Sequence, residues 1–415
     1  MPSDLGRALT AAVIGAGPAG LMAADVMVRA GLQVTVFDRM PSAGRKFLMA
    51  GRGGLNLTHS EPIDEFLRRY ADASAWLGPA ITAFSPGDVR TWADGHGQET
   101  FVGSSGRVFP KSFKASPLLR AWLRELNELG VMLETRKHWT GWGHDGALSF
   151  SDGLNVNADV CVLALGGASW PRLGADGNWV SVLADKGIEV APLVASNAGV
   201  TCNWSDMTIA RHAGAPLKRI AVTLAGRTVR GEAMISRSGL EGGAIYALSR
   251  ELRNVLATSD YAELQLDLRP ELDVAQLTAR LAKIPRKQSL SNRLRKAAGL
   301  SPQAISVWRD CVDWKNLETD EALAHSLKAV VVKVTGIQPI DRAISSAGGI
   351  AANEIDENFM LTRLPGVFVC GEMLDWDAPT GGYLLQACFA TGRAAGAGAA
   401  GFALKSAGQL AAEPG

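Results

Sequence analysis

The residues best suited to chemistry begin near the N-terminus, in a glycine-rich turn. This turn, residues 15–20, follows the short apolar run 11–14 and precedes a helical pattern over 21–30. In such a turn the first glycine permits a tight bend, the second lets the backbone approach a pyrophosphate, and the third allows close packing of helix on strand. The free N–H groups and the positive dipole of the helix N-terminus then face the phosphates. The candidate cofactor-binding residues here are Gly15, Ala16, Gly17, Pro18, Ala19 and Gly20.

An acidic residue completes this unit. Asp38 follows the second apolar run, 34–37, and can accept hydrogen bonds from ribose hydroxyls; Arg39 follows it directly. A glycine turn alone is a weak signal. Here strand, turn, helix, strand and acid occur in the required order, which predicts a β-α-β unit that binds a dinucleotide rather than a glycine turn without a ligand.

A second motif, residues 44–59, comes directly after Asp38 and reads GRKFLMAGRGGLNLTH. Its glycines, cations and short polar side chains predict a loop wrapped around phosphates and the polar edge of a cofactor ring. The alternative is a basic surface loop. Arg45 and Lys46 are the candidates for phosphate or ribose, and Asn56 and Thr58 for the ring. The candidate cofactor-binding residues are Arg45, Lys46, Phe47, Gly53, Gly54, Asn56 and Thr58.

A third motif lies near the C-terminus, where Gly371-Glu372 ends a predicted strand over 366–370 and TGGYLLQ occupies 380–386. An acid at a strand end can hold a ribityl chain. A Gly-Gly helix start that faces the N1–C2=O edge of a flavin would stabilise the anionic reduced ring. A segment of this type favours FAD over NAD. The candidate cofactor-binding residues are Gly371, Glu372, Gly381, Gly382, Tyr383 and Leu384.

A fourth motif, ALGGASWP over residues 164–171, ends a predicted strand over 160–165. Its two glycines let the chain pass close to a cofactor, so Ala164 and Gly166 are further candidates, and Trp170 would form a pocket wall. The alternative is an ordinary strand-to-turn connection.

Catalytic residues are poorly marked in this sequence. No Ser/His/Asp set and no paired carboxylates of a general acid–base site stand out. The weak candidates are His59, which is near the cofactor by sequence, and Asp377 and Tyr383, which flank the loop predicted to face the flavin. Arg107 is a candidate for binding an anion.

The elements that would position these residues predict an α/β fold. The clearest helix spans 116–130, with Ser116 as N-cap, Pro117 at its first position and Gly130 after its end. Residues 217–236 alternate as β-structure does, and 270–329 have helical spacing. The nucleotide-binding domain is therefore expected to be discontinuous, formed by residues 1–190 and by 330–415, which begin with a returning β-strand. A β-rich insert spans 191–269 and a helical insert spans 270–329.

Composition excludes several classes of protein. The chain has 415 residues, 47% of them hydrophobic, and a net charge of +1, so overall charge indicates neither a nucleic-acid nor an acidic partner. Its five cysteines are spread singly, which argues against a metal site or a redox disulfide motif and favours reduced thiols in the cytoplasm. Apolar segments are too short for a membrane span. The basic stretch 280–296 is either a solvated helical face or a surface for an anionic partner.

Together the motifs resemble the bacterial BaiN/YhiN-like flavoproteins, the aminoacetone-oxidase-like family, across essentially the whole chain. The resemblance implies a Rossmann-type FAD-binding domain with an inserted β-barrel-like domain and a helical subdomain. Its implied activities include amine oxidation, steroid reduction and reduction of a ribosomal RNA uridine.

This chain departs from the family pattern at two places. Many relatives have Gly-Arg-Cys-Asn where it has Gly53-Gly54-Leu55-Asn56, and many have Gly-Gly-Tyr-Asn where it has Leu384 after Tyr383. A uridine reductase needs an acid to protonate the ring carbon, which a thiol near the flavin can supply and Leu55 cannot. These departures indicate a more apolar pocket and a divergent branch.

The sequence thus predicts an FAD-dependent oxidoreductase that transfers a hydride through flavin N5. NAD(P)H is a possible transient donor without a domain of its own, because no second GxGxxG unit occurs. An organic donor is the other option, the acceptor is unassigned, and a small-molecule substrate is expected. The competing hypothesis is a flavin-bearing RNA- or ribosome-associated protein, including an rRNA uridine reductase. The sequence assigns no oligomeric state.

Overall fold

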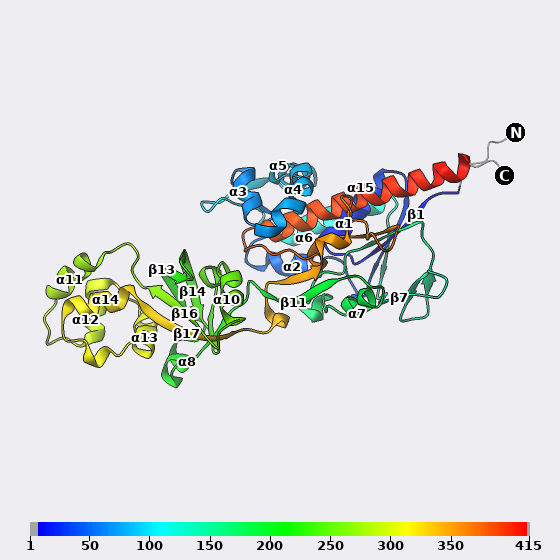
Figure 1. Ribbon diagram of the computed structural model, residues 1–415. Coiled ribbons are helices and arrows are strands. Elements are labelled where there is room, and N and C mark those ends of the chain that lie inside the picture. Colours follow the sequence, from blue (N-terminus) through cyan, green and yellow to red (C-terminus); the bar gives the residue numbers. More distant parts are fainter. Residues whose placement is uncertain (1–6, 413–415) are drawn as a thin grey trace. The chain divides into compact units, whose positions relative to one another are not determined.

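The structure, a computed structural model, describes residues 7–412. These residues form two compact units (Figure 1). The first unit contains the chain up to residue 194 and again from residue 345, and the second contains residues 195–344.

A five-stranded parallel sheet forms the centre of the first unit, in the order β19-β10-β1-β2-β6. Its strands are β1 (Thr10–Ile14), β2 (Gln33–Asp38), β6 (Met132–Thr135), β10 (Val160–Leu163) and β19 (Val367–Val369). Numbered along the chain and read from β6, this is the order 3-2-1-4-5 of dinucleotide-binding sheets. The β1, β2 and β10 strands are mostly buried, as their apolar runs predict. The predicted Rossmann-type α/β fold is confirmed.

Two helices from opposite ends of the chain pack side by side on this sheet (Figure 1). They are α1 (Pro18–Arg29) and α15 (Tyr383–Ala412). A Cβ atom added to Gly396 would lie 2.7 Å from the carbonyl oxygen of Ala23, and one added to Gly392 would collide with that of Ala19. The small residues of α15 therefore let the two backbones approach each other.

Helix α6 (Ala115–Glu128) has the predicted apolar face, with Leu118 and Trp122 buried, but its start differs from the prediction. The N-cap is Lys114, which makes no side-chain cap, so the expected capping by Ser116 is wrong. Pro117 is the third residue of the helix, not the first as predicted, and it is tolerated there because the first N–H groups of a helix have no intrahelical acceptor. Gly130 follows the helix with φ +91°, as predicted.

The second motif is not the loop that the sequence predicts. Residues 45–50 form helix α2 (Arg45–Ala50), and a 3-10 turn, η1 (Gly51–Gly53), follows. All six residues of α2 favour helix or tolerate it, and Phe47 anchors the helix in the core with 1% of its surface exposed. The abundant glycines therefore flank a helix here instead of forming one continuous loop.

The other elements of the first unit are short and surround the sheet. Two are three-stranded antiparallel sheets, β3-β5-β4 and β7-β8-β9, and one is the two-stranded sheet β11-β18. The bounds are β3 (Thr58–His59), α3 (Ile63–Arg68), α4 (Ser74–Ala83), α5 (Pro86–Gly95), β4 (Thr100–Val102), β5 (Arg107–Pro110), β7 (Trp139–Trp142), β8 (Leu148–Phe150), β9 (Asn155–Val156), α7 (Trp179–Ala184), β11 (Val190–Ser196) and β18 (Ser345–Ile350).

The second unit is built on a closed barrel of six strands, in the order β12-β15-β14-β13-β16-β17. Val222, Leu264 and Val332 fill its interior with at most 1% exposure, and the predicted β-barrel-like domain is confirmed. The strands are β12 (Val200–Cys202), β13 (Pro216–Leu224), β14 (Arg227–Ile235), β15 (Gly239–Glu241), β16 (Ala262–Asp267) and β17 (Val330–Ile337). The helices are α8 (Asp206–His212), α9 (Gly243–Tyr246), α10 (Ser249–Leu256), α11 (Val274–Ala282), α12 (Leu290–Ala298), α13 (Pro302–Cys311) and α14 (Asp320–Lys328).

None of the helices within residues 7–412 combines the length and the apolar character that a bilayer span requires.

Candidate functional site

The glycines of the first motif are required for two different reasons. A Cβ atom on Gly15, which has φ +109°, would collide with the carbonyl of Ala164, and one on Gly20 would collide with the carbonyl of Gly15. The protein itself therefore excludes side chains at these two positions. A Cβ atom on Gly17 would meet nothing within 4 Å. Gly17 therefore borders a space that no protein atom occupies.

The N-terminus of α1 lies at this open face. Its N-cap, Gly17, has no side chain, and the first turn carries no acid. The Asp38 carboxylate lies alongside and accepts hydrogen bonds from the N–H groups of Ala16 and Met40, each at 2.7 Å. Burial raises the pKa of Asp38, although these N–H groups oppose that shift. Positive helix dipole and backbone donors therefore face an open space beside one carboxylate, an arrangement suited to a phosphate with a neighbouring ribose.

Lys46 joins three of the predicted motifs. Its Nζ donates to Glu372 Oε2 at 2.6 Å and to Ser169 Oγ at 2.8 Å. The other carboxylate oxygen of Glu372 accepts the N–H of Ser346 at 2.9 Å. The Ser346 hydroxyl in turn accepts the N–H of Ala168 at 2.8 Å. Both serines are at most 2% exposed. Glu372 is consequently fixed in position at the end of β19.

The start of α15 is pressed against the end of the second motif. Gly382 has φ +101°, and its added Cβ atom would lie 2.5 Å from the backbone of Thr58. The buried Thr58 hydroxyl donates to Gln386 Oε1 at 2.7 Å. The Gln386 amide donates to the carbonyl of Phe84. The hydroxyl of Thr58 therefore has its hydrogen-bond acceptor within the protein and does not need one from a cofactor.

Tyr383, the first residue of α15, is the buried centre of a polar cluster that extends to the surface. Its hydroxyl donates to Glu61 Oε1 at 2.6 Å, and the hydroxyl of Tyr70 donates to its carbonyl at 2.8 Å. Arg69 binds both oxygens of Glu61, at 3.1 and 2.6 Å. Burial acts to raise the pKa of Glu61, but the hydrogen bonds from Arg69 and Tyr383 outweigh it and lower that pKa. Burial, with the hydrogen bond to Glu61, raises the pKa of Tyr383.

His59 stacks on the Tyr383 ring, with ring centroids 5.5 Å apart. Its Nδ1 accepts the N–H of Glu61 at 3.2 Å, and its Nε2 lies 2.9 Å from the carbonyl oxygen of Ser105. Since a carbonyl can only accept, Nε2 is the donor in its contact with Ser105. Both nitrogens of His59 and the hydroxyl of Tyr383 are thus engaged within the protein.

Two acids lie in the 375–382 loop. Asp375 is half-buried, and burial, together with the neighbouring Asp377, raises its pKa against the opposing hydrogen bond from the Gly348 N–H. Asp377, a predicted candidate, is also half-buried. Two neighbouring carboxyls, one held toward its protonated form, are the residue types of a general acid.

The side chains of several predicted residues make contacts within the protein. Phe47 lies in the core, with its ring centroid 6.5 Å from that of Phe389. Arg39 forms an ion pair with Asp176. Trp170 has a left-handed backbone, φ +59°, and the guanidinium of Arg172 lies 4.9 Å from its ring centroid. For other predicted residues the structure gives the following: Gly53 faces open space, Leu384 is half-buried, Gly166 and Gly371 have positive φ, and Gly381 precedes α15 with φ +138°.

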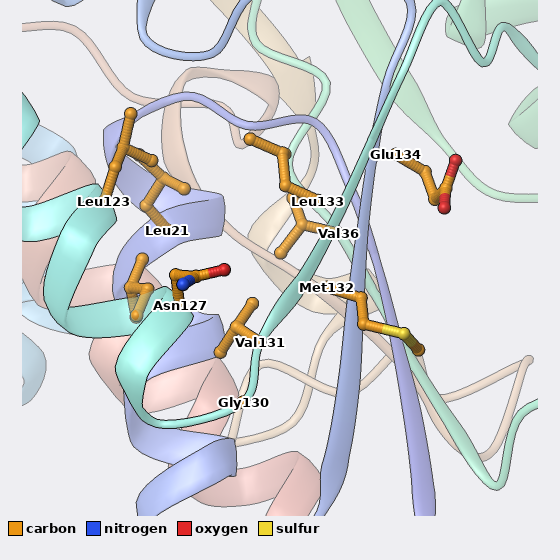
Figure 2. Close-up of a pocket in the computed structure, with 10 residues that line it drawn as sticks. Leu21, Val36, Leu123, Asn127, Gly130, Val131, Met132, Leu133 and Glu134 are labelled. Atoms are coloured by element: carbon orange, nitrogen blue, oxygen red, sulfur yellow. The ribbon is translucent and has the colours of Figure 1, made fainter.

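A pocket of about 590 Å³ lies on the flank of the sheet, between α1, α6 and β6, and holds none of the predicted site residues (Figure 2). Leu21, Val36 and Leu123 line it, with Asn127 and Glu134 as polar members. Figure 2 shows Met132 and Glu134 on the opposite side of β6 from Leu21 and Leu123, as strand alternation requires. This pocket is separate from the glycine turn.

In the second unit, the basic stretch 280–296 is largely exposed. Arg293 is the exception, buried in an ion pair with Asp320 at 2.5 Å. The exposed cations are Arg280, Lys283, Arg286, Lys287, Arg295 and Lys296. The structure thus agrees with a solvated face and leaves an anionic partner open.

Comparison with known proteins decides the family. Residues 9–398 match the model of the HI0933-like protein Rossmann domain. The chain belongs to the HI0933-like family. This match confirms the resemblance to the BaiN/YhiN-like flavoproteins, and with it the expected family of FAD-dependent oxidoreductases.

Members of the HI0933-like family with assigned names share modest identity with this chain. The 3-dehydro-bile acid delta(4,6)-reductase of Clostridium scindens is 26% identical over 94% of this chain and 98% of its own. The ribosomal RNA dihydrouridine synthase of Escherichia coli is 24% identical over 91% and 94%. Among solved structures, the open conformation of a flavocytochrome c3 fumarate reductase shares the fold, with a TM-score of 0.53 and 17% identity over 96% of this chain and 79% of that chain.

Two orphaned atoms show that the second motif fits a polar cofactor. Asn56 Oδ1 and Arg45 Nε are buried, and neither has a hydrogen-bond partner among the described residues. Buried polar atoms are costly to leave unpaired. An acceptor and a donor that await partners, together with the bare face of Gly17, are what an FAD-binding member of the HI0933-like family requires.

Sequence reasoning missed several residues of this site. Ser346 and Tyr70 gave no signal, because each acts through a contact distant in sequence. Glu61 and Arg69 are also absent from the predicted set, although Glu61 lies only two residues beyond His59. Gln386 and Ser169 stand inside quoted motifs, and their polar character at buried positions was the available signal.

Proposed function

We propose that this flavoenzyme passes a hydride through flavin N5, from NAD(P)H or an organic donor to an unsaturated small-molecule acceptor. The observation that carries the proposal is the open face of Gly17 at the uncapped N-terminus of α1, beside Asp38. A bare glycine next to unpaired helix N–H groups is the feature that a pyrophosphate needs, and a glycine turn without a ligand does not need it.

The chain's own residues supply binding and orientation. Glu372, fixed by Lys46 and the Ser346 N–H, presents a carboxylate at the strand end where a ribityl chain would lie. Arg45 and Asn56 offer the free donor and acceptor noted above. Helix α15 begins directly after Gly381 and Gly382, and the dipole at its N-terminus would favour a negative charge on a ring edge that faced it. The bound flavin itself would supply hydride acceptance and donation.

Proton transfer to the substrate is assigned to the Asp375–Asp377 pair. Burial and the neighbouring Asp377 raise the pKa of Asp375, which favours the protonated form that can deliver a proton to a carbon that has received a hydride. Of the three sequence candidates, Asp377 is assigned this role because it is the acid that raises the pKa of Asp375.

An activated ring double bond is the acceptor that the relatives' names support. One relative is named as a bile acid delta(4,6)-reductase and another as a dihydrouridine synthase, and both names describe the addition of hydrogen to a ring. Leu384, which is half-buried, stands where many relatives have a polar side chain, which favours an apolar substrate over a uridine in RNA. Leu55 is fully buried and carries no weight in this choice. We therefore do not favour the RNA-associated alternative.

The test is an anaerobic titration of the purified full chain with NADH or NADPH, followed by absorbance. Loss of the flavin band near ~450 nm supports a nicotinamide donor. If the band persists with both nucleotides but is lost with an organic donor, the protein is a flavoenzyme whose electron donor is organic. A flavin that no donor reduces contradicts the proposal.

A further inference from the structure

Three phenylalanine rings form a platform on the small sheet beside the second motif. Phe101 and Phe109 are directly paired across β4 and β5, with ring centroids 5.9 Å apart. Phe113, which follows β5, lies 5.2 Å from Phe101 and 5.5 Å from Phe109. These three rings are called the aromatic platform below.

The platform occupies the outward face of the sheet. The alternate positions Thr58, Thr100 and Val108 point inward and are at most 8% exposed. Outward positions of a small antiparallel sheet are ordinarily polar, because that face meets water. Here they carry Phe101 and Phe109, which are half-exposed, and Phe113 is 47% exposed beside them. An exposed cluster of three rings marks a surface that binds something.

Phe113 is held there against its backbone preference. Its φ is +57°, a left-handed conformation that costs a residue with a side chain about 1–2 kcal/mol. The Phe113 carbonyl accepts the N–H of Leu55 at 2.9 Å, and a Cβ atom on Gly54 would lie 3.1 Å from the Phe113 ring. The strain therefore places an apolar ring directly over residues 54–55, in the motif proposed to border the flavin.

Three exposed cations lie close to the platform residues along the chain. Arg107 lies on the outward face two residues before Phe109, Lys114 follows Phe113, and Arg52 lies two residues before Gly54. All three are exposed, and none forms an ion pair with a carboxylate in the described part of the chain. Such a rim complements a negative charge at the edge of an apolar ligand.

We propose that the aromatic platform, with Arg52, Arg107 and Lys114, is the substrate-docking surface of this flavoenzyme, and that it takes an amphipathic organic anion with a rigid apolar body. Three rings stack on the body, and the cations bind the anionic end. This inference rests on the proposed function for the redox step, whereas docking itself is measured by binding alone.

Calorimetric titration of the FAD-loaded full chain tests the proposal. The probes are a 3-oxo-4-ene C24 steroid carboxylate and 1-pyrenebutyrate, each compared with its neutral methyl ester. We expect both acids to bind, and each ester to bind more weakly than its acid. Phe113→Gly should weaken binding of the acids by at least about tenfold, since it removes a ring while relieving the strained backbone. Met132→Ala removes an apolar side chain that is 58% exposed on β6 and should leave binding unchanged.

The charge is tested separately. A double variant, Arg107→Gln with Lys114→Gln, should weaken binding of the acids but not of the esters. The matched control Arg295→Gln with Lys296→Gln in the second unit should change neither. Absence of binding by both acids, or equal binding by wild type and Phe113→Gly with flavin content unchanged, overturns the proposal. The flavin content of each sample is measured by absorbance. A chain that holds no flavin contradicts the proposed function, whereas the docking proposal is decided by the binding data alone.

Discussion

The Nζ atom of Lys46 lies 2.6 Å from Glu372 Oε2, although the two residues are 326 positions apart in the chain. The pair is partly buried, with 27% and 14% of the side chains exposed. It connects α2, near the N-terminus, to the end of β19, near the C-terminus. The two ends of the chain that form the first unit thus meet at one charged contact beside the proposed ribityl position.

Breaking this pair should be costly to stability and to cofactor binding. Lys46→Met leaves Glu372 partly buried without its cation and should lower the free energy of unfolding by about 1–3 kcal/mol. Glu372→Gln should cost less, because an amide oxygen still accepts the Ser346 N–H. Urea denaturation of the flavin-free chain measures both. A double variant whose loss equals the sum of the single losses would show that the pair contributes no coupling.

The hydrogen bond from Tyr383 to Glu61 should make stability depend on pH. The folded pKa of Glu61 is lowered, so its contribution is present above the unfolded carboxylate pKa near ~4 and is lost as pH falls through the folded value. Tyr383→Phe should therefore cost about 1–2 kcal/mol at pH 7 and progressively less in acid.

Tyr70→Phe is the matched control for this experiment. It also removes one buried hydroxyl donor, but the acceptor is the neutral carbonyl of Tyr383. Its cost should stay constant over the same pH range. Equal pH dependence of the two variants in denaturation measurements would contradict the role given to Glu61.

The contact of Gly382 with Thr58 predicts a position-specific effect of a single methyl group. Gly382→Ala places a Cβ atom 2.5 Å from backbone at φ +101° and should destabilise the chain by about 2 kcal/mol or more. Gly401→Ala, within helix α15, which begins directly after Gly382, meets nothing within 4 Å and should be neutral or stabilising by about 0.5–1 kcal/mol. Thermal unfolding of the two variants measures the difference. Similar melting temperatures would argue against a close approach of α15 to β3.

Local patterns predicted much of this fold because their causes are local. The glycine turn, the two apolar strands around it and Asp38 lie within 28 residues and make the β-α-β unit among themselves. The alternation over 217–236 likewise produced the β13–β14 hairpin. The returning segment 366–370 was recognisable because an apolar run before Gly371-Glu372 fits a buried parallel strand.

The site's contacts were less predictable because they are made across long stretches of chain. Nothing in the sequence around Lys46 indicates that its ammonium group will bind Glu372 and Ser169. Likewise, nothing around Thr58 indicates that its hydroxyl will donate to Gln386. The missed helix over 45–50 has another cause. Its flanking glycines masked six residues that are compatible with helix, and only the burial of Phe47 shows why they form one.

The discontinuous domain predicts that the inserted unit can be removed. Strands β11 and β18 pair with each other. Just outside them the Ala351 N–H donates to the Glu189 carbonyl, and within them Gly348 faces Pro192. Residue numbers therefore rise along one strand as they fall along the other. This antiparallel course brings Val194 close to Ser345. Replacing 195–344 with a two-residue Asn-Gly turn should therefore leave a chain that unfolds cooperatively and binds FAD. A folded product that binds no FAD would contradict the assignment of the cofactor to the first unit alone.

The most direct test of the central claim is the FAD affinity of Gly17→Ala compared with that of the wild type, measured with the stability of both flavin-free chains. We expect the wild type to take up about one FAD per chain with an absorbance band near ~450 nm. Because a Cβ atom at Gly17 meets no protein atom, Gly17→Ala should unfold like the wild type and yet bind FAD at least about tenfold more weakly. A wild type that takes up no FAD, or a Gly17→Ala chain that binds it equally well, would contradict the account.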